Sequence, residues 1–200
     1  MKKRIFLCAA ALPVFICIGI ALVFLLRPSE GAEAVYQENG YCITGQSMKQ
    51  VELSIPKNIL PEEIYTTGRD FTKEEAAVFQ TETTTVYLKR VQPANEGFLH
   101  LIFECSYDIG AGNRIISPWK MSDGNYGAGV FLESNVLTDD AGEYEDALGG
   151  GGQGAGDVFV VYARTEAVRA AEGDMKLQFR LNEITYEKSK SGHWIEKLWP

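Results

Sequence analysis

Residues 98–109, FLHLIFECSYDI, decide the fold of this chain. Apolar and polar side chains alternate along them, which is typical of a strand with one buried side and one side facing water. The apolar positions are Leu99, Leu101, Phe103, Cys105, Tyr107 and Ile109. His100, Glu104, Ser106 and Asp108 alternate with them, and only Phe98 and Ile102 depart from the polar side. The stretch predicts a strand that covers a hydrophobic core.

Segments on both sides repeat this period of two or are short apolar runs bounded by turn residues. Pro56 ends the first of them, which could be an edge strand, and the turn at 188–192 predicts a closing hairpin. The predicted strands are residues 47–55, 83–92, 98–109, 130–138, 158–164, 175–185 and 193–199. Six or seven short strands favour a mainly β fold, an antiparallel β-sandwich.

One or two short helices are expected beside these strands. Pro61 stands at a possible first helical position with acidic residues behind it. Thr72 and Glu75 form a capping-box pattern that predicts a helix over 73–80. A single helical turn is expected over 165–173, with Gly173 as its stop.

Residues 139–157, DDAGEYEDALGGGGQGAGD, are acidic and then rich in glycine, and they predict a mobile loop. Its carboxylates suit a hard cation such as calcium, although their spacing differs from that of the EF-hand and is equally typical of a soluble turn. These calcium candidates are Asp139, Asp140, Glu143, Glu145 and Asp146. No Lys-Ser/Thr pair follows the glycines at 149–152, so they do not form a phosphate-binding loop.

Towards the N-terminus, residues 5–26 contain no charge, and Lys2, Lys3 and Arg4 precede them. A helix of this length spans roughly 33 Å, enough to cross a hydrocarbon core of ~30 Å. The cations keep residues 1–4 in the cytoplasm and send the rest across the cell membrane. The prediction is a single-pass signal anchor in the lipid bilayer, a juxtamembrane stalk at 27–46 and an extracytoplasmic domain at 47–200.

A cleavable secretory signal is the alternative interpretation of this N-terminal segment. Ala32-Glu33-Ala34 has the small-x-small form of a cleavage site, so cleavage near Ala34 would release a secreted domain. Neither Cys8 nor Cys17 follows the small residue that a lipid-attachment signal requires, and both are interpreted as apolar helix residues.

The charge balance of the outer part bears on its partners. Residues 31–200 carry 15 basic and 26 acidic residues, a formal charge of −11. Such a surface repels phosphate backbones, so nucleic acid is not expected as a partner.

Cys42 and Cys105 are the cysteines outside the apolar run. In an oxidising compartment they could form a disulfide, and the alternative is that Cys105 is a core residue of its strand. The spacing leaves both interpretations open.

Aromatic residues on predicted loops and on the closing hairpin suggest a contact patch for a protein or glycan partner, although packing across the sandwich explains some of them equally. They are Trp119, Tyr126, Tyr144, Trp194 and Trp199. His100 and Ser106 share a strand face, but residues two apart on a strand stand ~7 Å from each other, too far for a catalytic triad along one strand. No catalytic residue, cofactor or transition-metal site is predicted.

Leu137, Asp140, Gly142 and Tyr144, followed by Gly156-Asp157-Val158, lie within a stretch of about residues 83–186 that resembles a known group of domains. These are the telokin-like, immunoglobulin-like extracytoplasmic domains of Gram-positive bacterial surface proteins of unknown function. The resemblance implies an immunoglobulin-like β-sandwich and an outward-facing module, and it implies no particular activity.

The leading hypothesis is therefore a membrane-anchored extracytoplasmic binding module without catalytic activity, with loops at 110–128 and 139–157 as its adaptable surface. One alternative is an anchored or secreted hydrolase whose site the fold assembles. Another is a structural accessory subunit of a membrane assembly.

Overall fold

The computed structural model describes Val35 and residues 41–94, 97–122, 125–153 and 157–188. The chain divides into two compact units, Met1–Glu30 and Gly31–Pro200, and the described residues belong to the second. Among the helices that the structure describes, none has the length and apolar character required to span a bilayer.

Several predicted segments lie outside the described residues. They are the cytoplasmic tip at 1–4, the transmembrane helix at 5–26, most of the stalk at 27–40 and the second strand of the closing hairpin at 193–199.

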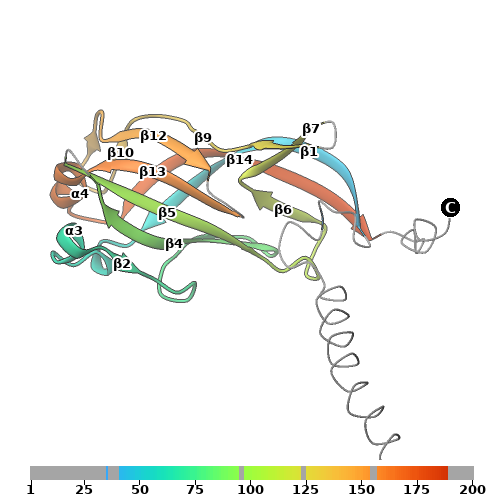
Figure 1. Ribbon diagram of the computed structural model, residues 1–200, viewed down its shortest axis with the longest axis horizontal. Coiled ribbons are helices and arrows are strands. Elements are labelled where there is room, and N and C mark those ends of the chain that lie inside the picture. The colour runs from blue at the N-terminus through green and yellow to red at the C-terminus, as the bar shows by residue number, and fades with distance from the viewer. Residues whose placement is uncertain (1–34, 36–40, 95–96, 123–124, 154–156, 189–200) are drawn as a thin grey trace, which may run out of the picture. The chain divides into compact units, whose positions relative to one another are not determined.

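Two six-stranded antiparallel sheets make up most of the described part of the chain (Figure 1). The first sheet has the order β1-β14-β10-β11, with β6 and β9 also paired to β14. Its strands are β1 (Tyr41–Ile55), β6 (Arg114–Ser117), β9 (Phe131–Leu132), β10 (Leu137–Thr138), β11 (Glu143–Tyr144) and β14 (Met175–Lys188). The long strands β1 and β14 pair over their whole length, from Tyr41 opposite Lys188 to Ile55 opposite Met175.

The second sheet has the order β12-β13-β5-β4-β2, with β3 also paired to β4. Its strands are β2 (Arg69–Asp70), β3 (Ala77–Gln80), β4 (Thr84–Pro93), β5 (Phe98–Tyr107), β12 (Leu148–Gln153) and β13 (Val158–Arg164). The remaining elements are the hairpin of β7 (Trp119–Ser122) and β8 (Asn125–Ala128), a 3-10 turn η1 (Lys57–Ile59), and the short helices α3 (Ile64–Thr67) and α4 (Thr165–Ala170). The mainly β, antiparallel prediction is confirmed.

Both sheets contribute to one large hydrophobic core. Phe103 of β5 stacks on Phe159 of β13 at 5.1 Å between ring centroids, and Phe179 of β14 packs edge-on against Phe159 at 5.6 Å. The alternation predicted for residues 98–109 is confirmed within β5, where Leu99, Leu101, Phe103 and Cys105 are buried. Met175, Leu177, Phe179 and Leu181 of β14 are buried in the same way.

Strand β14 has buried residues on both of its sides. Beyond Leu181 the buried residues are Asn182, Ile184 and Tyr186, which are even-numbered and therefore lie on the opposite side of the strand. Ile184 and Tyr186 form a second cluster with Ile115 and Val35, and the ring of Tyr41 meets that of Tyr186 at 5.4 Å. The odd-numbered side of β14 faces the large core only as far as Leu181. The next residue on that side, Glu183, lines a cleft.

Strand β1 begins earlier than predicted. It starts at Tyr41 instead of residue 47, so residues 41–46 of the predicted stalk belong to the folded domain. The physical reason is their pairing with the far end of β14, where Cys42 lies opposite Glu187. The prediction that this strand lies at a sheet edge and ends before Pro56 is confirmed.

The helix predicted over 73–80 is wrong, although its capping box forms. The backbone N–H of Thr72 donates to Glu75 Oε2 at 2.9 Å, and that of Glu75 donates to Thr72 Oγ1 at 3.4 Å. The chain then enters β3 instead, because Val78 is buried in the core and the backbone N–H of Leu88 donates to the carbonyl of Ala76 at 2.9 Å. Tertiary pairing overrides the local helix signal.

The other two helix predictions are closer to the structure. Helix α3 forms close to the predicted place, but it begins at Ile64, so Pro61 is not its first residue. Helix α4 covers the start of the turn predicted over 165–173, but it ends at Ala170, before Gly173. The strand predicted over 130–138 is divided into β9 and β10.

The glycine-rich part of the predicted loop at 139–157 is a strand. Residues 148–153 form β12, which pairs with β13 through a register shift between Gly149 and Gly151. A Cβ on Gly151 would lie 2.9 Å from the carbonyl oxygen of Val160, so the two backbones approach closely at this point. A Cβ on Gly150 or Gly152 would meet no atom within 4 Å.

We therefore expect Gly151→Ala to lower the free energy of unfolding by about 1–3 kcal/mol, because the added methyl group forces the strands apart. Gly152→Ala on the same strand is the matched control, with an expected change of at most about 0.5 kcal/mol. Urea unfolding of the full chain measures both. Equal losses in the two variants would show that the β12–β13 contact is not close.

Candidate functional site

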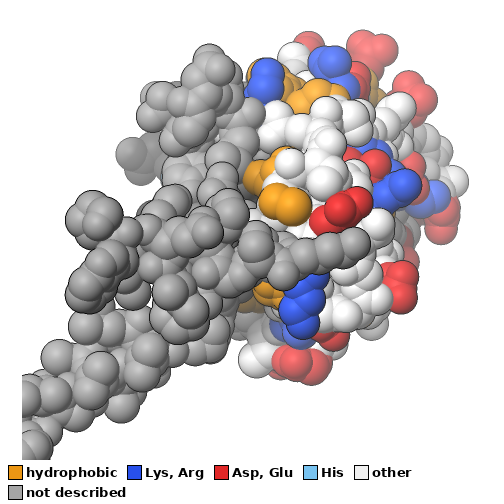
Figure 2. Space-filling view, turned by 90° about the vertical axis from the view of Figure 1, so that its right-hand side faces the viewer, with side chains coloured by type: hydrophobic (Ala, Val, Ile, Leu, Met, Phe, Trp, Pro, Cys, Tyr) orange, Lys and Arg blue, Asp and Glu red, His pale blue; other side chains and the backbone are white. Residues whose placement is uncertain are grey.

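A shallow hollow of about 580 Å3 lies on the outer side of the second sheet, near the hairpin that joins β4 to β5. It is lined by Gln92, Pro93, Ala94, Phe98, His100, Gly149, Gly150 and Tyr162. None of these is Asp, Glu, Lys or Arg. The face shown in Figure 2 is different, because acidic and basic side chains are interspersed there and hydrophobic ones form only small groups.

One row of residues crosses four strands and forms the floor of the hollow. Gly149 of β12 lies opposite Tyr162 of β13, Tyr162 lies opposite His100 of β5, and His100 lies opposite Gln92 of β4. The Tyr162 ring stands edge-on to the His100 ring at 4.7 Å between centroids. Because Gly149 has no side chain, the β12 side of Tyr162 is not covered, and Tyr162 is 39% exposed.

Phe98 forms the neighbouring wall. It lies opposite Arg164, whose guanidinium carbon is 5.4 Å from the centre of the Phe98 ring. The Arg164 Nε also donates to the carbonyl oxygen of Asp146 at 2.8 Å. The guanidinium group of Arg164 therefore already has the Phe98 ring and the Asp146 carbonyl as partners beside the hollow. The lining itself offers aromatic faces, one amide, one imidazole and backbone groups.

The described members of the aromatic patch predicted from the sequence lie in two elements of the fold: Trp119 and Tyr126 in the β7–β8 hairpin, and Tyr144 in β11. Trp119 is half-buried and packs against the second hydrophobic cluster. Tyr144 packs against the large core, and its hydroxyl donates to Asp139 Oδ2 at 3.2 Å and lies 3.1 Å from the carbonyl oxygen of Ala170. Tyr126 belongs to β8, and Trp194 and Trp199 lie outside the described residues.

The sequence did not point to Phe98, His100 and Tyr162 as a group. Its one signal was Phe98, which interrupts the polar side of its strand. Tyr162 lies in an apolar run without alternation, so its outward direction became visible only with the register of β13 on β5.

The carboxylates proposed as calcium ligands are not brought together. Within the described ranges, no group of three or more His, Cys, Asp and Glu residues could hold a metal ion. Asp140 is 3.9 Å from Lys176, and Glu143, Glu145 and Asp146 are exposed. The described geometry gives the calcium prediction no support: Glu143 lies opposite Thr138 in the β10–β11 pair, and Asp139 accepts backbone donors.

Asp139 holds the turn between β10 and β11 and the segment after α4. It accepts backbone N–H groups from Ala141, Gly142, Glu172 and Gly173. Burial alone would raise the pKa of Asp139, but these donors stabilise the carboxylate and lower its pKa to about 2. Its role in the structure is to hold these backbone segments together.

Cys42 and Cys105 are both free thiols, so the possible disulfide is not formed in this structure. Cys42 is exposed on β1 of the first sheet, and its Sγ lies 3.7 Å from the carbonyl oxygen of Glu187. Cys105 lies in β5 of the second sheet and is buried. Burial, followed by the charge of Asp157, raises the pKa of the Cys105 thiol. Cys105 is a core residue, as the alternative interpretation held.

The fold and the hollow define a mainly antiparallel β domain with an uncharged aromatic surface. Comparison with known proteins adds no relative: no family model, no curated protein and no solved structure matches the chain. Its function must therefore be inferred from the geometry of the site.

Proposed function

We propose that this chain is a membrane-anchored extracytoplasmic binding module whose outer hollow holds an uncharged glycan. The observation that carries the proposal is the composition of the hollow, in which Tyr162 and Phe98 stand beside Gln92 and His100 and, among the described residues, no charged side chain takes part in the lining. Binding sites of this kind combine apolar and aromatic walls with a few polar groups that fix orientation.

The chemistry of a sugar ring matches this lining. The C–H faces of a sugar are apolar and can lie on the exposed Tyr162 ring, as apolar groups do on amphipathic aromatic residues. Its hydroxyl groups can donate to and accept from the Gln92 amide, which offers both functions. A volume of about 580 Å3 is in the range of small-molecule sites.

Strand β12 leaves one side of the hollow open. Gly150 and Gly152 project no side chain, and a Cβ at either position would meet open space. A sugar ring in the hollow can therefore cover Gly150 without a steric block, whereas Gly152 lies outside the lining.

The proposed setting is an immunoglobulin-like sandwich on the outer side of a membrane. Its support is the core shared by the two antiparallel sheets, together with the resemblance of residues 83–186. Antiparallel sheets of this type can leave one side open to solvent, where ligands bind. The uncharged run at 5–26, with Lys2, Lys3 and Arg4 before it, supports the anchor and its orientation.

The test is the binding of the purified full-length chain to a printed array of neutral oligosaccharides. We expect Tyr162→Ala to weaken binding by at least about tenfold, because exposed aromatic residues at the centre of a site carry much of the binding energy. Phe131→Ala is the matched control, since Phe131 is 50% exposed on β9 of the other sheet. Unchanged binding by Tyr162→Ala, or binding only to charged oligosaccharides, would contradict the proposal.

A further inference from the structure

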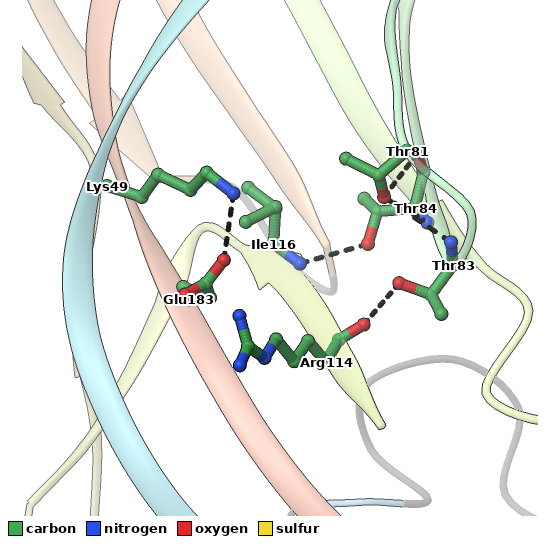
Figure 3. Close-up of polar contacts among 7 residues, drawn as sticks. All are labelled: Lys49, Thr81, Thr83, Thr84, Arg114, Ile116 and Glu183. Atoms are coloured by element: carbon green, nitrogen blue, oxygen red, sulfur yellow. Dashed lines mark hydrogen bonds and ion pairs between the residues drawn. The ribbon is translucent and has the colours of Figure 1, made fainter. Parts of the chain in front are cut away.

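A second concavity, a cleft of about 190 Å3, opens where β14 leaves the shared core (Figure 3). Lys49 of β1 and Glu183 of β14 form one wall, and their charged groups are 2.8 Å apart. The turn between β3 and β4 and the start of β6 complete the lining. The cleft therefore joins the two sheets at a place that the outer hollow does not reach.

Hydrogen bonds hold the walls of the cleft in place. The Thr81 Oγ1 accepts the backbone N–H of Thr84 at 3.0 Å, which fixes the turn between β3 and β4. The Thr84 Oγ1 accepts the backbone N–H of Ile116 at 2.9 Å, and the Thr83 hydroxyl donates to the carbonyl oxygen of Arg114. Thr83 and Thr84 are buried, so β6 is tied firmly to this turn. Preformed walls reduce the cost of ordering a site when a ligand binds.

Two opposite charges in the lining are unpaired. Lys49 and Glu183 neutralise each other, but neither Arg114 nor Glu82 has a side-chain ion pair among the described residues. Figure 3 shows the Arg114 side chain extending across the cleft towards Glu183. Every other arginine that the structure describes has a polar partner: Arg69 with Glu75, Arg90 with Asp70, Arg164 with the Asp146 carbonyl, Arg169 with Glu62 and Arg180 with Glu133.

We propose that this cleft binds a small zwitterion of the α-amino-acid type, with its carboxylate on Arg114 and its ammonium group on Glu82. The planar guanidinium matches a carboxylate in a two-pronged hydrogen bond, and a free carboxylate side chain matches an ammonium group. The four ionic side chains of the lining carry no net charge, so a neutral zwitterion keeps that balance. A phosphate dianion would place two negative charges beside Glu82 and Glu183, which electrostatic repulsion disfavours.

The test uses L-alanine as the probe and isothermal titration of the purified full-length chain. We expect saturable binding, weakened by about tenfold or more in both Arg114→Gln and Glu82→Gln, because each variant removes one charge-assisted contact. Lys188→Gln is the matched control for the loss of a positive charge, since Lys188 is exposed and does not line the cleft. Arg114 and Glu82 are both exposed, so their variants retain the buried core.

Acetate and methylammonium, titrated separately, test whether both charges act together. Each half of the zwitterion should bind more weakly than L-alanine, acetate through Arg114 alone and methylammonium through Glu82 alone. Acetate that binds as tightly as L-alanine would show a simple anion site and overturn the proposal. No saturable L-alanine signal at millimolar concentrations, or equal binding in all variants, would also overturn it. None of these results bears on glycan binding at the outer hollow.

Discussion

Replacing Phe159 with alanine is expected to lower the free energy of unfolding by about 3–5 kcal/mol, the range for large-to-small changes at buried aromatic positions. Phe159 is fully buried, and its ring lies 5.1 Å from that of Phe103 and 5.6 Å from that of Phe179. These three rings come from β13, β5 and β14, so the cavity would open between the two sheets. Guanidinium-induced unfolding of the full chain measures the loss.

Phe131→Ala provides the comparison, because it removes the same side chain from an exposed position on β9. Its expected cost is at most about 1 kcal/mol, since surface substitutions away from special features change stability little. If the Phe159 and Phe131 variants lost equal stability, the two sheets would not share the core that the structure shows.

Asp139→Asn is expected to lower the melting temperature at neutral pH by several degrees, and to remove part of the acid sensitivity of the fold. The carboxylate of Asp139 accepts four backbone N–H groups and has a pKa of about 2 in the folded chain. An unfolded aspartate has a pKa of about 3.9. The folded pKa is the lower one, so Asp139 stabilises the fold above about pH 4 and loses this contribution as the pH falls towards about 2.

Thermal melts of both proteins between neutral pH and pH 2 test this expectation. The difference in melting temperature should be constant near neutral pH and should narrow between about pH 4 and pH 2, where the wild-type carboxylate takes up its proton. Asp140→Asn is the control, because Asp140 is exposed and its ion pair with Lys176 is long, at 3.9 Å. A difference independent of pH would show that the charge of Asp139 does not matter.

The sequence was informative wherever a strand buries one side. In residues 98–109 and 175–185 the alternating apolar residues are the residues that line the shared core, from Leu99 to Cys105 and from Met175 to Leu181. Alternation predicts such strands because successive side chains point to opposite sides. The change of side beyond Leu181 was not visible, since it depends on β6 and the second cluster, which pack on that part of β14.

Local sequence signals gave wrong predictions where pairing with a strand distant in the sequence determines the backbone conformation. The capping box of Thr72 and Glu75 forms its hydrogen bonds, but pairing with β4 takes the following residues into β3. The glycines at 149–152 were interpreted as a loop because of their backbone entropy, yet β13 orders them as a strand. Neither pairing can be deduced from the residues of the segment itself.

The two candidate sites could not be predicted from the sequence for the same reason. The hollow depends on the register that places Gly149, Tyr162, His100 and Gln92 in one row across four strands. Glu82 of the β3–β4 turn and Arg114 of β6 both line the cleft, without any motif in the sequence. The predicted clusters were instead neighbours along the chain, such as the carboxylates from 139 to 146, which the fold separates.

The most direct measurement of the central claim is the affinity of two leucine variants of β12 for neutral oligosaccharides. Gly150 lines the hollow and Gly152 does not, and a Cβ at either position would meet no atom within 4 Å. If the hollow holds the glycan, Gly150→Leu fills it and binding falls by at least about tenfold, while Gly152→Leu binds as the wild type does. Equal, undiminished binding by both variants would contradict the account.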